Sequence, residues 1–345
     1  MTNPTKQSHR FKELDALRGL AALMVMFFHF SLGRALPVEF KYIRLGNTGV
    51  ELFFMISGFV IFMSFDHITK SSQFIKSRLI RLYPTYWTVV TFTFLLIATV
   101  SFKTHDPGNI NFKTYLGNMT MFQYYLKIPD LDGPYWTMII EMTFYIVMLL
   151  LFRFKQLKHV IVIGIVTCLI MQALFFTAST TLVSELITSL PLLIYAPLFF
   201  AGIIFFQIKT GRGNQLYYYI FIGLFFICQV ASYKYIVNKI FMSRAEYAVM
   251  LTIYFSLFIL FVNHKLRFIV SKTTLFFGKI SYALYLIHQY LSINFIIPTL
   301  MNELHFRFPV AAFIAFLVST LLAALITNYI EIPVRRLAKK HIYSK

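Results

Sequence analysis

The first apolar stretch of the chain, residues 14–33, reads LDALRGLAALMVMFFHFSLG. A helix needs about 20 mostly apolar residues to cross the hydrocarbon core of a bilayer, and this stretch has that length. It nevertheless contains Arg18 and His29, although a charged side chain at the membrane centre costs at least about 2.5–3.5 kcal/mol. The stretch therefore predicts a membrane helix that retains two basic groups for a functional reason.

The composition of the whole chain agrees with this interpretation. Of its 345 residues, 58% are hydrophobic and 13% are charged, whereas charged residues make up about 25% of a typical soluble domain. We therefore expect an all-α polytopic membrane protein in which residues 1–345 form a single integral-membrane domain. Ten spans are predicted, at Leu14–Gly33, Thr48–Phe65, Leu79–Phe102, Tyr135–Phe154, Leu157–Ala178, Leu182–Gln207, Gln215–Tyr233, Ala245–Asn263, Thr274–Leu300 and Phe308–Glu331.

The distribution of Lys and Arg predicts the orientation. If the N-terminus is cytoplasmic, 22 of the 32 basic residues lie at the cytoplasmic side, which agrees with the positive-inside rule and puts both termini inside. The same rule accounts for the net charge of +19, so no nucleic-acid partner is expected. The longest outside stretch, Lys103–Pro134, is expected to cover the outer face as a lid or substrate platform. Cys168 and Cys228 lie in apolar runs and are expected to be buried free thiols.

Arg18 and His29 are expected to form a pair of stations along the first span. They are eleven residues apart, which is about 16 Å along a helix at 1.5 Å per residue. Eleven residues is close to three turns, so both side chains project from nearly one face, with Arg18 near the inner surface and His29 in the outer half. The structural alternative is a snorkelling arginine and a core histidine.

Two carboxylates lie in later spans. Glu51 opens the second span at a depth similar to that of His29, where a carboxylate would orient an imidazole as in an acid–base dyad. The alternative for Glu51 is an interfacial side chain that faces water. Glu141 lies about a turn and a half below the outer interface of the fourth span, which favours a functional role or a pairing with a buried base.

An Arg-x-x-Arg sequence, Arg78 and Arg81, leads into the third span. Its spacing places both guanidinium groups on one helical face, where they form a fork suited to phosphate. Ordinary positive-inside charge is the alternative. Because Arg18 lies at the same membrane level, the three arginines predict a phosphate-bearing ligand at the cytoplasmic mouth.

The ninth span carries a polar stripe formed by Tyr282, Tyr285 and His288. These residues are candidates to contact substrate or to line a pore, although packing between helices explains such a stripe equally well. The chain contains no P-loop, Rossmann fingerprint, metal-ligand cluster or Gly-x-Ser-x-Gly elbow. No metal is predicted, and Ser57 is interpreted as a helix-packing serine.

Six short motifs follow one another along nearly the whole chain. They are Asp15-Ala16-Leu17-Arg18-Gly19 with His29, the stretch Gly49 to Phe59, the stretch Arg78 to Pro84, Trp136-Thr137 with Glu141 and Phe144-Tyr145, Ile280-Ser281-Tyr282 through His288, and Glu331-Ile332-Pro333. In this order they resemble the integral-membrane acyltransferase 3 family, bacterial O-acyltransferases that modify lipopolysaccharide, peptidoglycan and other surface glycans.

The resemblance implies a cytoplasmic acyl-CoA donor, most simply acetyl-CoA, and an extracytoplasmic glycan acceptor such as lipopolysaccharide O-antigen. Arg18, Arg78 and Arg81 would hold the CoA phosphates. His29 would act as a general base on the acceptor hydroxyl or carry the acyl group briefly, with Glu51 and Glu141 orienting His29 or the acceptor. Asp15 belongs to the first motif and is a further candidate at the substrate path.

The resemblance also implies a multi-pass protein of the bacterial inner membrane, in contact with membrane lipids. Many relatives carry an extracytoplasmic hydrolase-like domain after the membrane part, whereas this chain ends at Lys345. We therefore expect either a separate extracytoplasmic transferase partner or direct acylation of the acceptor. The alternatives are a transporter or flippase for a lipid-linked sugar or an anion, an enzyme with a different acyl donor, and a membrane scaffold.

Overall fold

The computed structural model describes residues 11–32, 38–104 and 111–342. These residues form helices and connecting turns, and none of them belongs to a strand, which confirms the all-α prediction. The α-helices are α1 (Lys12–Phe30), α2 (Gly49–Ser64), α3 (Ser71–Thr104), α4 (Phe112–Met119), α5 (Trp136–Arg153), α6 (Val160–Thr177), α7 (Thr180–Ser189), α8 (Leu192–Lys209), α9 (Gln215–Ala231), α10 (Arg244–Val262), α11 (Lys272–Tyr290), α12 (Phe308–Ile326) and α13 (Ile332–Ile342).

Short helices of other types join or extend these elements. The 3₁₀ segments are Val38–Thr48, Gly133–Tyr135, Leu157–His159, Ser232–Tyr235, Val237–Ile240 and Arg267–Ile269, and the π-helical segments are Leu291–Ile296, Thr299–Glu303 and Thr327–Glu331. The last π segment joins α12 to α13 without a break, so the chain runs helically from Phe308 to Ile342.

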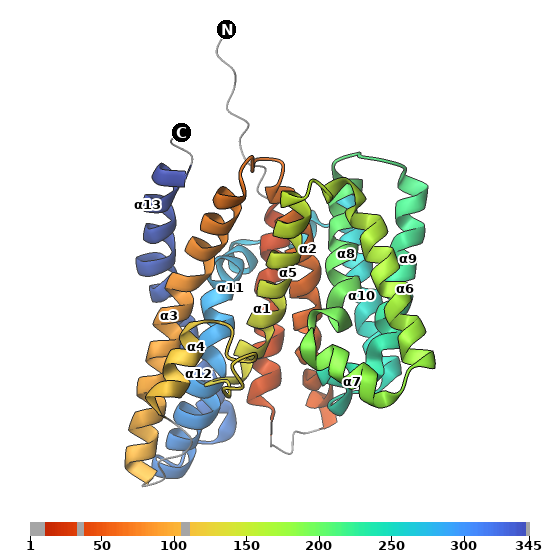
Figure 1. Ribbon diagram of the computed structural model, residues 1–345. Coiled ribbons are helices and arrows are strands. Elements are labelled where there is room, and N and C mark those ends of the chain that lie inside the picture. Colours follow the sequence, from red (N-terminus) through yellow and green to blue (C-terminus); the bar gives the residue numbers. More distant parts are fainter. Residues whose placement is uncertain (1–10, 33–37, 105–110, 343–345) are drawn as a thin grey trace.

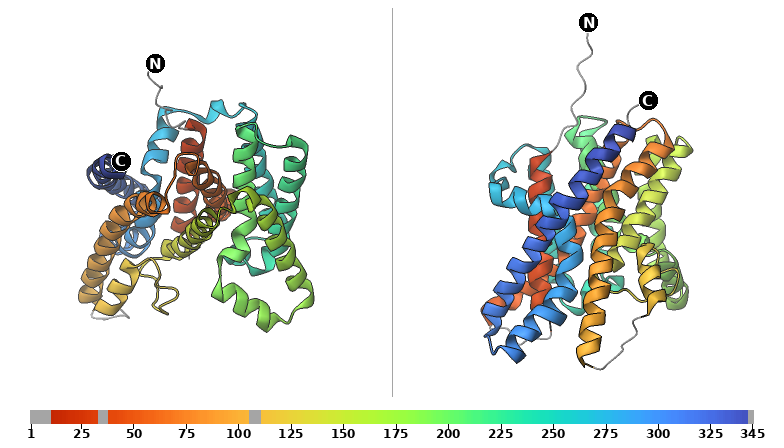
Figure 2. Two further views of the ribbon diagram at one scale, coloured as in Figure 1. Left: turned by 45° about the horizontal axis from the view of Figure 1, so that its top comes forward. Right: turned by 90° about the vertical axis from the view of Figure 1, so that its left-hand side faces the viewer.

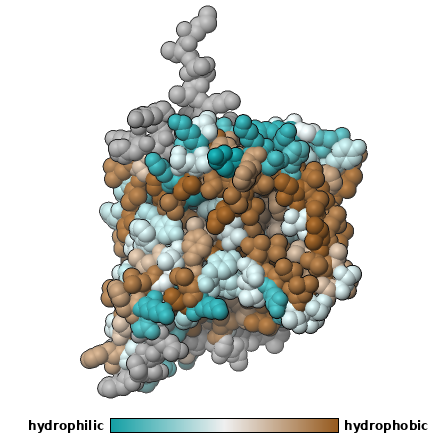
Figure 3. All heavy atoms as spheres, viewed as in Figure 1, coloured by the Kyte–Doolittle hydropathy of each residue, from teal (hydrophilic) through white to brown (hydrophobic). Residues whose placement is uncertain are grey.

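The length and composition of the helices confirm a polytopic membrane protein. Within the described residues, nine helical segments are long and apolar enough to span a bilayer. On the face seen in Figure 3, a broad hydrophobic band lies between more polar ends. The predicted first span forms α1, which is helical to Phe30, whereas Gly33 lies outside the described residues. Helix α1 carries Glu13, Asp15 and Arg18 and is not one of these nine segments. It lies at the centre of the bundle (Figure 1).

The predicted span Leu182–Gln207 begins too early, because the membrane-length helix starts at Leu192. Its first part forms a separate short helix, α7, which Ser179 caps by accepting a hydrogen bond from the backbone N–H of Leu182. Pro191 stands immediately before α8, which is the membrane-length helix of this region. Proline lacks the N–H that a continuous helix needs at this point, so the apolar run is divided into two helices.

Helix α3 differs from its prediction by beginning eight residues earlier, at Ser71 instead of Leu79. Its 34 residues extend about 51 Å at 1.5 Å per residue, which exceeds the roughly 30 Å hydrocarbon core. Arg78 and Arg81 therefore both lie within α3, as their placement on one helical face requires.

Close helix packing defines the centre of the bundle, where α1 contacts α11 and α2 contacts α8. A Cβ atom on Gly278 would lie 2.0 Å from the carbonyl oxygen of Asp15, and one on Gly19 would lie 2.7 Å from the backbone nitrogen of Gly278. Glycine is required at both positions because α1 and α11 pack backbone against backbone, as small residues allow in membrane helices. Gly58 permits the same approach between α2 and α8.

The described chain begins and ends at one face of the bundle, which we call the terminal face (Figures 1 and 2). The connection between α4 and α5 lies at the opposite face. There, the Tyr124 and Tyr125 hydroxyls donate hydrogen bonds to the carbonyl oxygens of Thr188 (2.7 Å) and Ser189 (3.1 Å) at the end of α7. The part of Lys103–Pro134 that the structure describes thus contains α4 and contacts the α7–α8 turn.

Candidate active site

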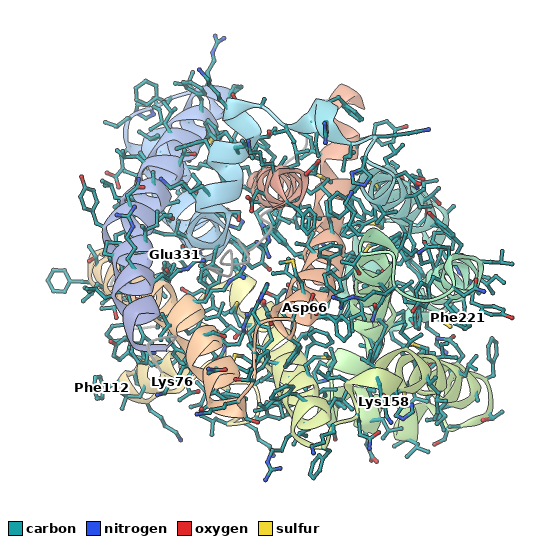
Figure 4. All side chains as sticks on the ribbon, turned by 90° about the horizontal axis from the view of Figure 1, so that it is seen from above. Asp66, Lys76, Phe112, Lys158, Phe221 and Glu331 are labelled. Atoms are coloured by element: carbon teal, nitrogen blue, oxygen red, sulfur yellow. The ribbon has the colours of Figure 1, made fainter. Side chains whose placement is uncertain are left out.

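A cavity of about 500 Å³ opens among α1, α2, α3, α5, α11 and the junction of α12 with α13. Ligand pockets typically have volumes of about 300–1,000 Å³. Figure 4 looks down on the terminal face, and Glu331 is labelled at the α12–α13 side of this region. The charged residues that line the cavity are Asp15, Arg18, Arg81, Glu141, Lys279, Glu331 and Arg335, and the hydroxyl-bearing residues are Ser57, Thr137, Ser281, Tyr282, Tyr285 and Thr327.

Three helices bring the cavity arginines and carboxylates together. Arg18 of α1 and Arg81 of α3 both lie within electrostatic range of Glu141 of α5. Asp15, one turn before Arg18, adds negative charge near Arg18, and Glu331 adds negative charge near Arg81. Of the three arginines predicted to lie together, Arg18 and Arg81 share this cavity. Glu141, which was expected to orient His29 or the acceptor, lies beside these arginines.

Glu141 is the centre of a hydrogen-bonded group. The Tyr145 hydroxyl donates to Glu141 Oε1 at 2.5 Å, and the Ser57 hydroxyl donates to the same oxygen at 3.4 Å. Arg78 does not line the cavity. Its guanidinium lies 5.6 Å from the Tyr145 ring centroid and 5.4 Å from that of Phe74, within cation–π range. Arg78 therefore contacts the Tyr145 ring, whose hydroxyl binds Glu141. Ser57, interpreted from the sequence as a helix-packing serine, also donates a hydrogen bond to Glu141.

A third carboxylate at the cavity, Glu331, forms an ion pair with Arg335. Arg335 donates to Glu331 Oε1 at 3.0 Å, and Glu331 is 7% exposed. Sequence analysis placed Glu331 in a motif without assigning it to the site. A carboxylate at the end of an apolar span, with an arginine one turn later, was the available signal.

A direct contact between two histidines lies farther along α1 and α11, toward the face opposite the termini. His288 Nε2 lies 2.9 Å from His29 Nδ1. His29 Nδ1 also lies 2.8 Å from the carbonyl oxygen of Val25, and His288 Nδ1 lies 3.0 Å and 2.9 Å from the carbonyl oxygens of Leu284 and Tyr285. His288 is fully buried and His29 is half-buried. The sequence-based predictions for His29 and for His288 did not include a contact between the two imidazoles.

The tyrosine stripe of α11 connects the cavity to the histidine pair. Tyr282 and Tyr285 both line the cavity, and His288 follows Tyr285 by three residues, about 4.5 Å along the helix. The Tyr285 hydroxyl lies 3.1 Å from Thr137 Oγ1 of α5, and the Tyr282 hydroxyl donates to the carbonyl oxygen of Leu82. The tyrosines of α11 thus form hydrogen-bond contacts with both α3 and α5.

Glu51 does not pair with His29, which corrects the expected dyad. The polar contacts of the His29 ring are to Val25 and His288, whereas Glu51 is completely buried beside the Tyr247 hydroxyl of α10. The prediction rested on similar depth in the membrane, and depth does not determine the direction in which a side chain leaves its helix. Glu51 faces the α8–α10 side of the bundle instead of α11.

The loop before α5 is anchored to the end of α11, near the histidine pair and at the face opposite the termini. Asp132 Oδ2 accepts a hydrogen bond from the Tyr290 backbone N–H at 3.1 Å, and Oδ1 accepts one from Gly133. Asp132 is 4% exposed. Burial raises the pKa of Asp132 to about 7, against the opposing effect of the two N–H donors. Asp132 lies within the stretch Lys103–Pro134 and was not among the predicted site residues, because its partners are backbone N–H groups, which leave no sequence signal.

The polar groups of the site are guanidinium, carboxylate, hydroxyl and imidazole side chains. Among the residues that the structure describes, no three His, Cys, Asp or Glu side chains converge as metal ligands. Cys168 and Cys228 are buried free thiols on α6 and α9, away from the cavity lining. The arrangement offers guanidinium groups at one end and an accessible imidazole at the other.

Comparison with known proteins identifies the family. Residues 11–329 match the acyltransferase 3 family, described as an acyltransferase domain. A protein of Acidianus two-tailed virus named as an acetyltransferase, ORF330, is 23% identical over 84% of this chain and 85% of its own length. Nodulation protein 10 of Rhizobium leguminosarum bv. viciae is 26% identical over 42% of this chain and 45% of its own length. No solved structure matches. The chain therefore belongs to the acyltransferase 3 family of integral-membrane acyltransferases.

Proposed function

We propose that this protein is an O-acyltransferase that moves an acyl group, most simply acetyl, from cytoplasmic acyl-CoA to a hydroxyl group of an extracytoplasmic glycan. The observation that carries the proposal is the cavity at the terminal face, with its arginines, from which the α11 stripe leads toward the His29–His288 pair. The terminal face is then cytoplasmic, as the distribution of Lys and Arg predicts, and the protein resides in the bacterial inner membrane among its lipids.

The cavity end suits the donor. CoA carries a pyrophosphate and a 3′-phosphate, and arginine forks bind such groups with paired charge-assisted hydrogen bonds. Arg18 and Arg81 line the cavity and would contact the phosphates directly. Arg78 would act from behind through Tyr145 and Glu141. Asp15 and Glu141 would hold the two cavity arginines in place before the donor binds.

The histidine end suits the transfer step. His29 Nε2 would accept the proton of the acceptor hydroxyl while the hydroxyl oxygen bonds to the acyl carbon. The carbon–sulfur bond to CoA then breaks, and the departing thiolate takes the proton from His29, which leaves an ester and free CoA. In the variant with a covalent intermediate, Nε2 attacks the thioester first and passes the acyl group to the hydroxyl. Both routes need the same ring nitrogen.

The remaining predicted residues take supporting roles in this proposal. Glu51, buried beside Tyr247, would fix the α2–α10 packing next to the path. Tyr282 and Tyr285 would line the route of the acyl chain. The acceptor, lipopolysaccharide O-antigen or another surface polysaccharide, would approach from the outer face beside the loop held by Asp132, either directly or through a separate extracytoplasmic transferase.

Radiolabel transfer in membranes tests the proposal. Membranes that contain the protein and cell-envelope glycan are given [14C]acetyl-CoA, and the label is followed into the glycan fraction. We expect transfer by wild type and by the control His159→Ala, whose imidazole is exposed and remote in sequence from both histidines of the site, but not by His29→Ala. If the label stays on CoA with all three proteins, a transporter replaces the acyltransferase proposal.

A further inference from the structure

The hydrogen-bond partners of the histidine pair determine which ring nitrogen of each imidazole carries a proton. His288 is fully buried, and both of its ring nitrogens have partners within hydrogen-bonding distance. The carbonyl oxygens of Leu284 and Tyr285, which lie next to Nδ1, can only accept hydrogen bonds, so Nδ1 of His288 carries a proton. In a neutral imidazole the other nitrogen then presents a lone pair, and that nitrogen, Nε2, faces His29.

The His29 end leads to the same assignment independently. Its Nδ1 lies 2.8 Å from the Val25 carbonyl oxygen, which also can only accept, so His29 Nδ1 carries a proton. Two N–H groups cannot face each other at the observed 2.9 Å. The His29 N–H therefore donates to both the carbonyl of Val25 and Nε2 of His288, and His288 cannot carry a proton on Nε2.

One ring nitrogen of the pair then has a lone pair without a hydrogen-bond partner among the described residues, namely His29 Nε2. With its proton on Nδ1, neutral His29 has its lone pair on Nε2. That nitrogen has no hydrogen-bond partner among the described residues, and the ring is half-buried, in contrast to the fully buried His288. His29 Nε2 is thus the accessible basic atom of the pair.

We propose that His288 is a positioning residue that holds His29 in the Nδ1–H tautomer, so that Nε2 is free to accept a proton or an acyl group. This inference rests on the proposed acyltransferase function. When Nε2 takes a proton, the Nδ1–H of the resulting imidazolium donates to two acceptors that are already in place. Hydrogen bonds from an ionised donor are stronger than those from a neutral one, so the pair stabilises the charge as it forms.

The pair differs from a Ser-His-Asp arrangement in the nature of the orienting group. There, a carboxylate holds the imidazole and stabilises its charge. Here a neutral imidazole, itself oriented by two backbone carbonyls, takes that place. Among the described residues, the hydrogen-bond partners of the two rings are backbone carbonyl oxygens and each other, and none is a carboxylate. Asp132 contributes at a distance by binding the backbone of Tyr290, two residues beyond His288.

Two substitutions at one position separate positioning from packing. Glutamine places an amide oxygen near the location of Nε2 and can accept from His29, whereas asparagine is one carbon shorter and stays near Leu284. We expect His288→Asn to lower kcat for acetyl-CoA turnover about 10- to 100-fold, the effect of losing one hydrogen bond to a charged group, with an unchanged KM for acetyl-CoA. His288→Gln should recover most of the rate, and His159→Asn should have no effect.

The tautomer itself can be observed by 15N NMR of histidine-labelled protein in detergent, with the His29 signals assigned by their loss in His29→Gln. We expect His29 of wild type and of His288→Gln to carry its proton on Nδ1. A wild-type proton on Nε2, or a His288→Asn variant with full kcat, would overturn the inference. If His288→Asn does not fold, the wild-type spectrum still decides. Full activity of His29→Ala would instead overturn the proposed function, so the two failures are distinct.

Discussion

Replacement of Gly278 by alanine tests whether the packing of α1 on α11 sets the geometry of the site. The new Cβ would lie 2.0 Å from the carbonyl oxygen of Asp15, against 3.4 Å for an ordinary contact. The backbones would have to separate locally by the difference, roughly 1.4 Å. If only half of this displacement reaches the histidine pair, the 2.9 Å contact grows to about 3.6 Å, which is no longer a hydrogen bond.

The expected consequences are a loss of stability and a loss of turnover. Overpacking of a close-packed interior costs typically about 1–3 kcal/mol, so Gly278→Ala should lower the melting temperature in detergent. Its kcat for acetyl-CoA hydrolysis should fall like that of His288→Asn, because both changes remove the same contact.

Gly223→Ala is the matched control for this substitution. Gly223 lies in α9, and a Cβ there would meet nothing within 4 Å. Alanine is favoured over glycine in a helix by about 1 kcal/mol, so this variant should melt at or above the wild-type temperature with unchanged turnover. Wild-type stability and activity in Gly278→Ala would refute the reasoning that the α1–α11 approach positions the histidines.

Three further predictions address the cavity and the outer loop. Arg81→Ala should raise the KM for acetyl-CoA about tenfold or more, whereas Arg267→Ala, an exposed arginine of the α10–α11 connection, should leave it unchanged; equal KM values would remove Arg81 from the donor site. Tyr145→Phe deletes the hydroxyl that binds Glu141 and should destabilise the protein by about 1.5–3 kcal/mol, measured by detergent melting; an unchanged melting temperature would contradict this. Because burial raises the pKa of Asp132 from 3.8 to about 7, its folded form retains a proton that the unfolded chain releases, so stability from this group is full below pH 3.8 and is lost as the pH rises to 7. Asp132→Asn should therefore reduce the fall in melting temperature between pH 5 and pH 8, and an unchanged fall would exclude this role.

The spans could be predicted from sequence because hydrophobicity alone determines them. Eight of the nine predicted spans after the first correspond to membrane-length helices whose ends shift by a few residues. The largest of these shifts is in α3, which begins at Ser71 instead of Leu79. The failure at Leu182–Gln207 has a local cause. Pro191 divides the apolar run just before α8, whereas the prediction rested on hydrophobicity alone and gave this proline no weight.

The site could be predicted in its components but not in its pairings. Buried charge identified Arg18, Arg81 and Glu141, which do share a cavity. Partner choice depends on the rotation of each helix about its axis, and a sequence without known packing does not determine that rotation. For this reason Glu51 was assigned to His29, while the contact with His288 was missed. The α1–α11 approach at Gly19 and Gly278 brings these histidines together.

The most direct test of the account is acetyl-CoA binding and slow acetyl-CoA hydrolysis by the purified protein in detergent. Wild type and His29→Ala are compared, with His159→Ala as control. The account predicts that all three bind acetyl-CoA with similar affinity, since the cavity arginines are intact, and that only His29→Ala fails to release CoA. Hydrolysis by His29→Ala at the wild-type rate, or the absence of acetyl-CoA binding by wild type, would contradict it.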